Sequence, residues 1–166
     1  MTTTSDPQEP VTVPVRLDID AHAPIFSKAL THLDNATTRQ LDAVDFDRGL
    51  RDLVRLRASQ LNGCAYCVDM HTKDARAAGE SEARIAGLPV WRETPFFTAR
   101  ERAVLAFTES VTRLTETHVP DEAYDEVAEH LSEDEIGALV ALLVTINAWN
   151  AVGVSTRAWE AGSYQP

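Results

Sequence analysis

The sequence predicts an all-α fold: one compact domain of about six to eight helices. Nearly every segment from Ala23 onward repeats apolar residues at helical spacing, and no segment shows convincing period-two alternation. Helix-start signals, Ser or Thr followed three residues later by Glu, stand at Thr98 and Ser132. A chain of 166 residues is long enough to bury an apolar core as a single domain without disulfide or metal support.

The N-terminal segment is polar, and we expect residues 1–12 to form a flexible tail ahead of a single domain over residues 13–166. Residues 11–24 contain two prolines and no clear period, which indicates an extended arm lying on the body of the domain. The start of the chain lacks the apolar stretch of a signal peptide, so a cytoplasmic location is expected. No apolar run is expected to reach the length of a membrane span.

Four helices are predicted in the first half of the domain. Apolar residues at helical spacing place them over about residues 25–33, 50–61, 64–78 and 81–87. Asp45 or Asp47 suits the N-cap of the second helix. The pair Asn62-Gly63 interrupts the pattern, and Gly79 ends the third helix.

Three further helices are predicted over about residues 98–114, 120–131 and 133–159. The last of them is apolar on most of its circumference over residues 136–154. Such a helix must be covered nearly all round, and neighbouring subunits are a source of part of that cover in so small a domain. A homo-oligomer is therefore expected.

Charge and cysteine content narrow the classes of function. The formal net charge of −11 argues against nucleic acid or an anionic membrane surface as the main partner, because phosphates would be repelled. The chain has only two cysteines, Cys64 and Cys67, whereas a secreted disulfide scaffold would scatter more of them. A close pair of cysteines in a cytosolic chain indicates redox chemistry or a metal site.

Cys64, Cys67 and His71 are the candidate catalytic residues. Steps of three and four residues place all three side chains on one helix face. Cys64 follows Gly63 at the expected start of a helix, where free N–H groups and the helix dipole favour a thiolate. His71 lies one turn from Cys67 and can exchange a proton with it. The second thiol can resolve a sulfenic acid to a disulfide, so the pattern predicts a dithiol–disulfide cycle.

Asp52 is the candidate acidic partner of His71. On one continuous helix it would be far too distant from the motif, about 18 Å from Cys64 along the axis. If the chain folds back at Asn62-Gly63, an antiparallel helix pair brings Asp52 near His71. A carboxylate there could orient the imidazole and support its proton transfer.

Blander interpretations of the same residues remain open. The two cysteines could be buried small apolar residues, or they could bind zinc with His71 as a third ligand. A fourth zinc ligand would have to come from a distant histidine: His22, His32, His118 or His130. Asp52 could be a solvated carboxylate paired with Arg55 or Arg48. Asn147 and Asn150 must find hydrogen-bond partners if buried, as structural residues or at a subunit contact.

The residues around the cysteines resemble a known family. The run from Leu50 to Cys64, followed by Tyr66, Cys67 and His71, is similar to the core of the alkylhydroperoxidase D-like (AhpD-like) proteins of the carboxymuconolactone decarboxylase family. The similarity covers about residues 50–79, and residues 146–150 also resemble small members. The resemblance implies an all-helical subunit that assembles into trimers or hexamers, with a peroxidase site that needs neither cofactor nor metal.

The resemblance also implies roles for the two thiols. Cys67 would react with the peroxide and Cys64 would resolve the product, whereas the helix-terminus argument alone favours Cys64 as nucleophile. The family usually has glutamate at the position of Asp52, and its best-studied members have histidine at the position of Tyr66. Tyr66 could be a core residue or a hydrogen-bond donor near the thiols.

The expected function is therefore reduction of a small hydroperoxide by a Cys-x-x-Cys cycle, with Cys67, Cys64, His71 and Asp52 as catalytic residues and an external dithiol as reductant. Two alternatives stay open. One is a cofactor-free lactone decarboxylase-like lyase, which would not need the cysteine pair. The other is a non-enzymatic redox sensor, whose thiols would oxidise once without sustained turnover.

Overall fold

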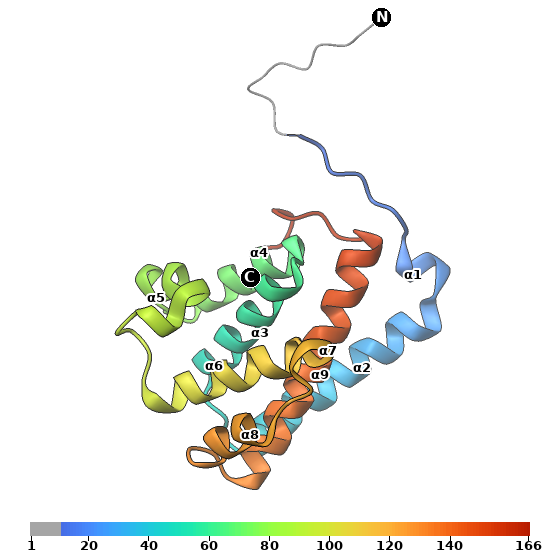
Figure 1. The fold of residues 1–166 in the computed structure, drawn as a ribbon. Helices are drawn as coiled ribbons and strands as arrows, with labels where there is room; N and C mark the ends of the chain where they lie inside the picture. The colour runs from blue at the N-terminus through green and yellow to red at the C-terminus, as the bar shows by residue number, and fades with distance from the viewer. Residues whose placement is uncertain (1–10) are drawn as a thin grey trace, which may run out of the picture.

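The structure is a computed structural model that describes residues 11–166, so residues 1–10 of the expected tail lie outside the described residues. Within the described residues every regular element is helical, and the predicted all-α class is confirmed (Figure 1). The elements follow in the order α1 Ile19–His22, α2 Pro24–Ala43, α3 Arg48–Asn62, α4 Ala65–Ala77, α5 Glu82–Gly87, the 3₁₀ helix η1 Leu88–Glu93, α6 Ala99–Thr112, α7 Leu114–Thr117, α8 Asp121–Ala128 and α9 Glu133–Thr156.

All seven predicted helices are present, and the additional elements are the single-turn α1 and α7 and the 3₁₀ helix η1. The two capping boxes form as expected, at Thr98 with Glu101 and at Ser132 with Glu135. Asp47 caps α3 by accepting the Leu50 N–H. These signals are local, so they act wherever the chain places the helix.

Three helix ends differ by three residues or more from the prediction, and one of them is that of α8, which ends at Ala128 rather than at Leu131. Helix α2 continues to Ala43, because its buried face repeats only at Leu30, Thr37 and Leu41, and polar residues between them hide the period. Helix α9 ends at Thr156, where Arg157 turns into the left-handed conformation, rather than at Trp159.

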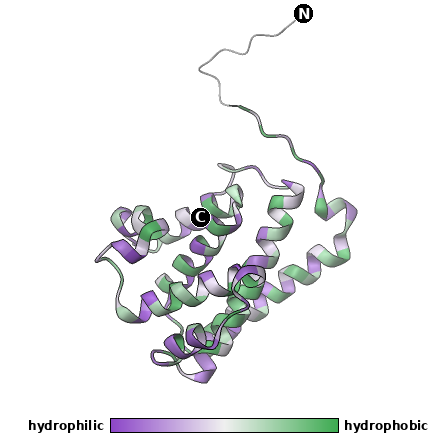
Figure 2. Cartoon of the chain, viewed as in Figure 1, coloured by the Kyte–Doolittle hydropathy of each residue, from purple (hydrophilic) through white to green (hydrophobic). Residues whose placement is uncertain are grey.

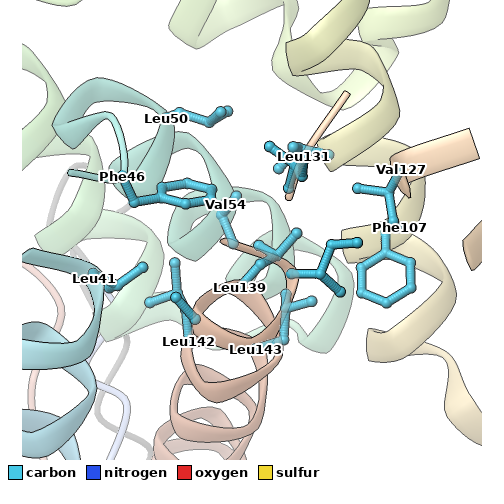
Figure 3. Packing of buried hydrophobic residues seen from close by; sticks show 13 residues of the cluster. Leu41, Phe46, Leu50, Val54, Phe107, Val127, Leu131, Leu139, Leu142 and Leu143 are labelled. Carbon is cyan, nitrogen blue, oxygen red and sulfur yellow. The ribbon is translucent and has the colours of Figure 1, made fainter. Parts of the chain in front are cut away.

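Helix α3 lies at the centre of the fold, packed against α4, α6 and α9, while α9 also packs against α2. Figure 3 shows Leu139, Leu142 and Leu143 of α9 pointing among side chains from other elements, including Phe46 and Phe107. A second buried cluster lies on the other side of α3, towards α4, α5, η1 and α6. The core therefore surrounds α3 and holds its C-terminal end in a defined place.

Helix α9 corrects the expectation that no apolar run reaches the length of a membrane span. Within residues 11–166 this helix alone is long and apolar enough to cross a membrane by length and composition, so the expectation that no run approaches a span is wrong. The uncharged Thr and Asn side chains within it interrupt the apolar run without adding charge. Half of its apolar window is buried inside the protein, and Figure 2 shows much of the helix coloured as hydrophobic where it passes through the bundle.

Some apolar side chains remain uncovered on the outer faces of α2 and α9. Ile25 and Phe26 of α2 and Val144 of α9 are the most exposed of them, at 87%, 51% and 53%. The expected homo-oligomer, which would cover such side chains, stays a prediction.

The predicted arm over residues 11–24 is only partly confirmed, because residues 11–15 are exposed and run away from the domain (Figure 1) and residues 19–22 form α1, so only Arg16 and Leu17 lie against the body. The backbone N–H groups of Arg16 and Leu17 both donate to the carbonyl oxygen of Thr156, at 2.8 and 3.0 Å. The Arg16 side chain also reaches the carbonyl of Val154 at 3.2 Å. These contacts join the N-terminal arm to the end of α9.

Candidate active site

The chain reverses direction at Gly63, as predicted. Gly63 caps α3 with φ of 69°, a left-handed conformation that glycine adopts without the steric cost borne by other residues. Helices α3 and α4 then pack side by side. The turn thus places the start of α4 against the rest of the bundle.

Cys64 and Cys67 form a disulfide at the start of α4. Helix α4 begins at Ala65, so Cys64 is its N-cap rather than a residue of its first turn, and its Sγ accepts the Cys67 N–H at 3.4 Å. Both residues are buried, with exposures of 2% and 4%. The two sulfurs are therefore bonded to each other, as the spacing of a dithiol pair allows. Two cysteines that served only as small buried apolar residues would not need this bond.

The two sulfurs have different surroundings. Cys67 and His71 line a cavity of about 420 Å³, and Cys64 is not among its lining residues. Part of its wall is aromatic: the ring of Trp159 lies 5.7 Å from both Tyr66 and Trp149 between centroids. Tyr66 is half-buried and lines this cavity rather than the core, and its role as a hydrogen-bond donor near the thiols stays a prediction.

Gly153 of α9 lies against the disulfide. A Cβ atom at this position would stand 2.8 Å from the Cys64 Sγ and 3.7 Å from the Cys67 Sγ. The missing side chain lets the α9 backbone approach Cys64 and cover it. Sequence reasoning did not identify Gly153, although a glycine inside a long apolar helix is a signal of close packing.

We expect Gly153→Ala to shift the thiol–disulfide equilibrium of the pair towards the dithiol by about tenfold. The added methyl overlaps the bonded Cys64 sulfur, and overpacking of this kind costs about 1–3 kcal/mol unless the sulfur moves away. The measurement is the oxidised fraction, by alkylation and intact mass, in buffers of graded dithiothreitol redox ratio.

Gly137→Ala is the matched control, because Gly137 lies on the same helix and a Cβ there meets nothing within 4 Å. Its equilibrium is expected to match that of the wild type. Identical curves for Gly153→Ala and Gly137→Ala would contradict the packing argument.

The carboxylate at ion-pair distance from His71 is that of Asp74, whereas Asp52 acts on His71 from farther away, through its charge. The His71 Nδ1 lies 3.4 Å from the Asp74 Oδ2, an ion-pair distance one helical turn along α4. Asp52 forms its ion pair with Arg55 at 3.3 Å, as one alternative allowed, and its side chain is only 16% exposed rather than solvated. The predicted fold-back is correct, but the nearest carboxylate comes from the helix of His71 itself.

The two carboxylates have opposite electrostatic surroundings. Burial raises the pKa of Asp52, and the charge of Asp74 adds to this, while Arg55 and His71 oppose it. Burial also works to raise the pKa of Asp74, but the contacts with His71 and Tyr164 outweigh it and hold the pKa below its usual range. Asp74 is thus the carboxylate kept as an anion, and Asp52 the one more ready to hold a proton.

A model of the carboxymuconolactone decarboxylase family matches residues 24–110, which run from the start of α2 to near the end of α6. The chain belongs to this family. The matched range contains the disulfide, His71, Asp74 and Asp52, whereas α9 and the C-terminal segment lie beyond it.

Two relatives of the protein support its membership of this family. The uncharacterised protein YdfG of Bacillus subtilis is 43% identical over 109 residues, which cover 66% of this chain and 74% of that protein. A solved protein of unknown function from Agrobacterium tumefaciens, described provisionally as the antioxidant defence protein AhpD, is 36% identical with a TM-score of 0.81. That match covers 92% of this chain and 99% of the other. The chain is therefore an AhpD-like member of the family.

The fold extends to a more distant enzyme. The debrominase Bmp8 has a TM-score of 0.73 at 20% identity, covering 86% of this chain and 74% of that one. At this identity the similarity shows the shared fold alone.

A polar network of this family member lies where α9 meets the end of α3. The Asn62 Nδ2 donates to the Oδ1 atoms of both Asn147 and Asn150, at 2.8 and 2.9 Å. The Asn150 Nδ2 donates to the Ser59 Oγ at 3.1 Å. These bonds satisfy the amide of the buried Asn150 and hold the end of α3, immediately before the Gly63 turn, against α9.

The described residues offer no obvious metal centre. Over residues 11–166 no three His, Cys, Asp or Glu side chains gather in an arrangement that could hold a metal ion. The two candidate thiol ligands are bonded to each other.

Proposed function

We propose that this protein reduces organic hydroperoxides by a dithiol–disulfide cycle at Cys64 and Cys67. The observation that carries the proposal is the placement of Cys67, bonded to Cys64, beside His71 in one cavity. Membership of the carboxymuconolactone decarboxylase family, with an AhpD-like relative, supports a peroxidase-related role at the level of the family.

The cycle balances in three steps. The Cys67 thiolate attacks the terminal oxygen of ROOH, the O–O bond breaks, and Cys67 sulfenic acid and an alcohol form. The Cys64 thiolate then attacks the Cys67 sulfur and displaces water, which leaves the disulfide. An external dithiol reduces that disulfide through a mixed disulfide and is itself oxidised.

His71 and Asp52 carry the protons in this scheme. His71 takes the proton of the Cys67 thiol and returns it to the departing alkoxide. Asp52, whose pKa is raised by burial, supplies a group near the imidazole that can hold a proton between steps. Cys64 is covered by Gly153, which suits a resolving thiol that need not meet the substrate.

The test is stopped-flow oxidation of the reduced protein by cumene hydroperoxide, followed by intact mass. We expect oxidation faster than that of a free thiol, and a loss of two hydrogens with no added oxygen. Oxidation at the free-thiol rate would overturn the proposal. Turnover of a carboxymuconolactone after both thiols are blocked would point to the lyase instead, and a single oxidation without sustained turnover would point to a sensor.

The cavity also predicts a substrate preference. Trp149, Trp159 and Tyr66 form an aromatic wall. The same cavity is lined by one cation, Arg55, and by three aspartates, which outnumber it and make the cavity acidic: Asp20, Asp34 and Asp74. We expect cumene hydroperoxide to react about tenfold faster than its para-carboxylate at low ionic strength, because these aspartates repel a second anion. The ratio should shrink in 0.5 M salt, a concentration chosen for strong screening; a ratio unaffected by salt would contradict the electrostatic explanation.

A further inference from the structure

The C-terminal segment after α9, residues 157–166, returns to α4. The Lys73 Nζ of α4 donates to the Tyr164 carbonyl at 2.9 Å, and the Gly162 N–H donates to the Asp69 Oδ2 at 2.9 Å. Figure 1 shows the red C-terminal end of the chain lying beside α4. Asp69 and Lys73 are four residues apart and form an ion pair with each other at 2.8 Å, so they lie on one face of α4. Both side chains bind backbone atoms of the C-terminal segment, which is therefore held against that face.

This segment brings one side chain to the candidate site. The Tyr164 hydroxyl donates to the Asp74 Oδ1 at 2.7 Å. The other oxygen of the same carboxylate, Oδ2, is the one that lies 3.4 Å from the His71 Nδ1. Asp74 thus stands between a tyrosine from the end of the chain and the histidine of the redox site.

The His71 Nδ1 needs this carboxylate. The atom is buried, and among the described residues it has no formed hydrogen bond. The Asp74 Oδ2 at 3.4 Å is too far for a short hydrogen bond but close enough for a small ring movement to make one. A buried nitrogen without a partner is costly, and the oxygen beside it is an acceptor only.

We propose that Asp74 is the positioning residue of His71: it accepts the Nδ1–H, and Tyr164 holds its carboxylate in place, so that the C-terminal segment completes the redox site. In a neutral imidazole one nitrogen donates and the other accepts. An Nδ1–H directed at Asp74 leaves Nε2 free to take a proton. The anionic carboxylate also stabilises the imidazolium formed when His71 does so.

Other charged groups near His71 do not replace Asp74. From α3, Asp52 and Arg55 are paired with each other. Asp20 and Asp34, from α1 and α2, line the same cavity. The hydrogen bond to Asp74, together with burial, raises the pKa of Tyr164 to about 12, so the hydroxyl keeps its proton and stays a donor. The pKa of Asp74 is lowered while that of Asp52 is raised, so of the two carboxylates Asp74 is the one favoured as the anion beside His71.

The test reads the tautomer of His71 directly, by long-range ¹H–¹⁵N NMR of the oxidised full-length protein. We expect the Nδ1–H tautomer in the wild type. In Asp74→Asn the Tyr164 hydroxyl holds the amide oxygen, so the amide NH₂ faces Nδ1 and His71 is expected to change to the Nε2–H tautomer. Asp52→Asn is the matched variant for a neighbouring carboxylate and should keep the Nδ1–H tautomer.

The inference rests on the proposed function only for its kinetic consequence. Asp74→Asn should slow hydroperoxide reduction by about a hundredfold or more, and Tyr164→Phe by a smaller factor in the same direction. An Nε2–H tautomer in the wild type, or an unchanged tautomer in Asp74→Asn, would overturn the assignment.

The two measurements separate the possible failures. A wild type that shows the Nδ1–H tautomer but no peroxidase activity would retain the positioning role of Asp74 and remove the proposed function. If Asp74→Asn does not fold, the wild-type tautomer and the Tyr164→Phe variant still decide. Loss of the Tyr164 hydroxyl should weaken the Nδ1–H signal of His71 and slow hydroperoxide turnover. The matched control is Tyr124→Phe, which changes an exposed tyrosine on α8.

Discussion

Replacing Cys67 by serine is expected to lower hydroperoxide turnover by at least about a thousandfold, because a serine hydroxyl cannot be oxidised to a sulfenic acid or form a disulfide. Cys67 is the cysteine that lines the cavity with His71. The measurement is consumption of cumene hydroperoxide in the presence of excess dithiothreitol. The fold should be retained, since the oxygen is smaller than the sulfur and the site is at a helix start.

Cys64→Ser is the matched variant, and it separates the two thiol roles. It should still reduce one equivalent of hydroperoxide and accumulate sulfenic acid on Cys67, detectable by dimedone labelling, because only the resolving thiol is missing. If Cys64→Ser loses the first equivalent while Cys67→Ser keeps it, the nucleophile is Cys64. That result would favour the helix-terminus argument over the family resemblance.

Asn150→Leu is expected to lower the free energy of unfolding by about 2–4 kcal/mol. Asn150 is only 1% exposed, accepts a hydrogen bond from Asn62 and donates one to Ser59. Leucine removes both bonds, so the buried Ser59 Oγ and the half-buried Asn62 Nδ2 each lose one partner, and a lost hydrogen bond costs about 1–3 kcal/mol. The two groups keep their bonds to the Arg55 carbonyl and to Asn147, respectively. Urea denaturation of the oxidised protein measures the change from the midpoint and slope.

The control for this prediction is Asn35→Leu, at an exposed position of α2. A substitution there should change stability by no more than about 0.5 kcal/mol. A change below about 1 kcal/mol for Asn150→Leu would mean that the amide network contributes little, and that apolar packing between α3 and α9 holds the end of α3 by itself.

The outline of the fold was predictable because its signals are local. Helical periodicity, the capping residues at Thr98 and Ser132, and the Asp47 N-cap each act within one or two turns of chain. The turn at Gly63 belongs to the same class, since a left-handed residue there depends on glycine itself. The single-turn helices α1 and α7 were missed because four residues are too few to show a period.

Some residues of the candidate site could likewise be predicted from local spacing, and others could not. Cys64, Cys67 and His71 could be placed together from spacing, because steps of three and four residues always share a helix face. Asp74 obeys the same rule, three residues after His71, yet a lone carboxylate on a helix is most often a solvated surface residue, and only burial distinguishes it. The choice between Asp52 and Asp74 therefore depended on geometry that spacing does not contain.

The sequence by itself determined the all-α class, the helix starts, the reversal at Gly63 and the common face of the two cysteines with His71, because each follows from residues within a few turns of one another. Tertiary structure alone decided that Gly153 covers Cys64, that Cys67 opens to the cavity, and that Tyr164 reaches Asp74. These contacts join residues about 90 positions apart, and they exist only because core packing around α3 brings α9 and the C-terminal segment back to α4.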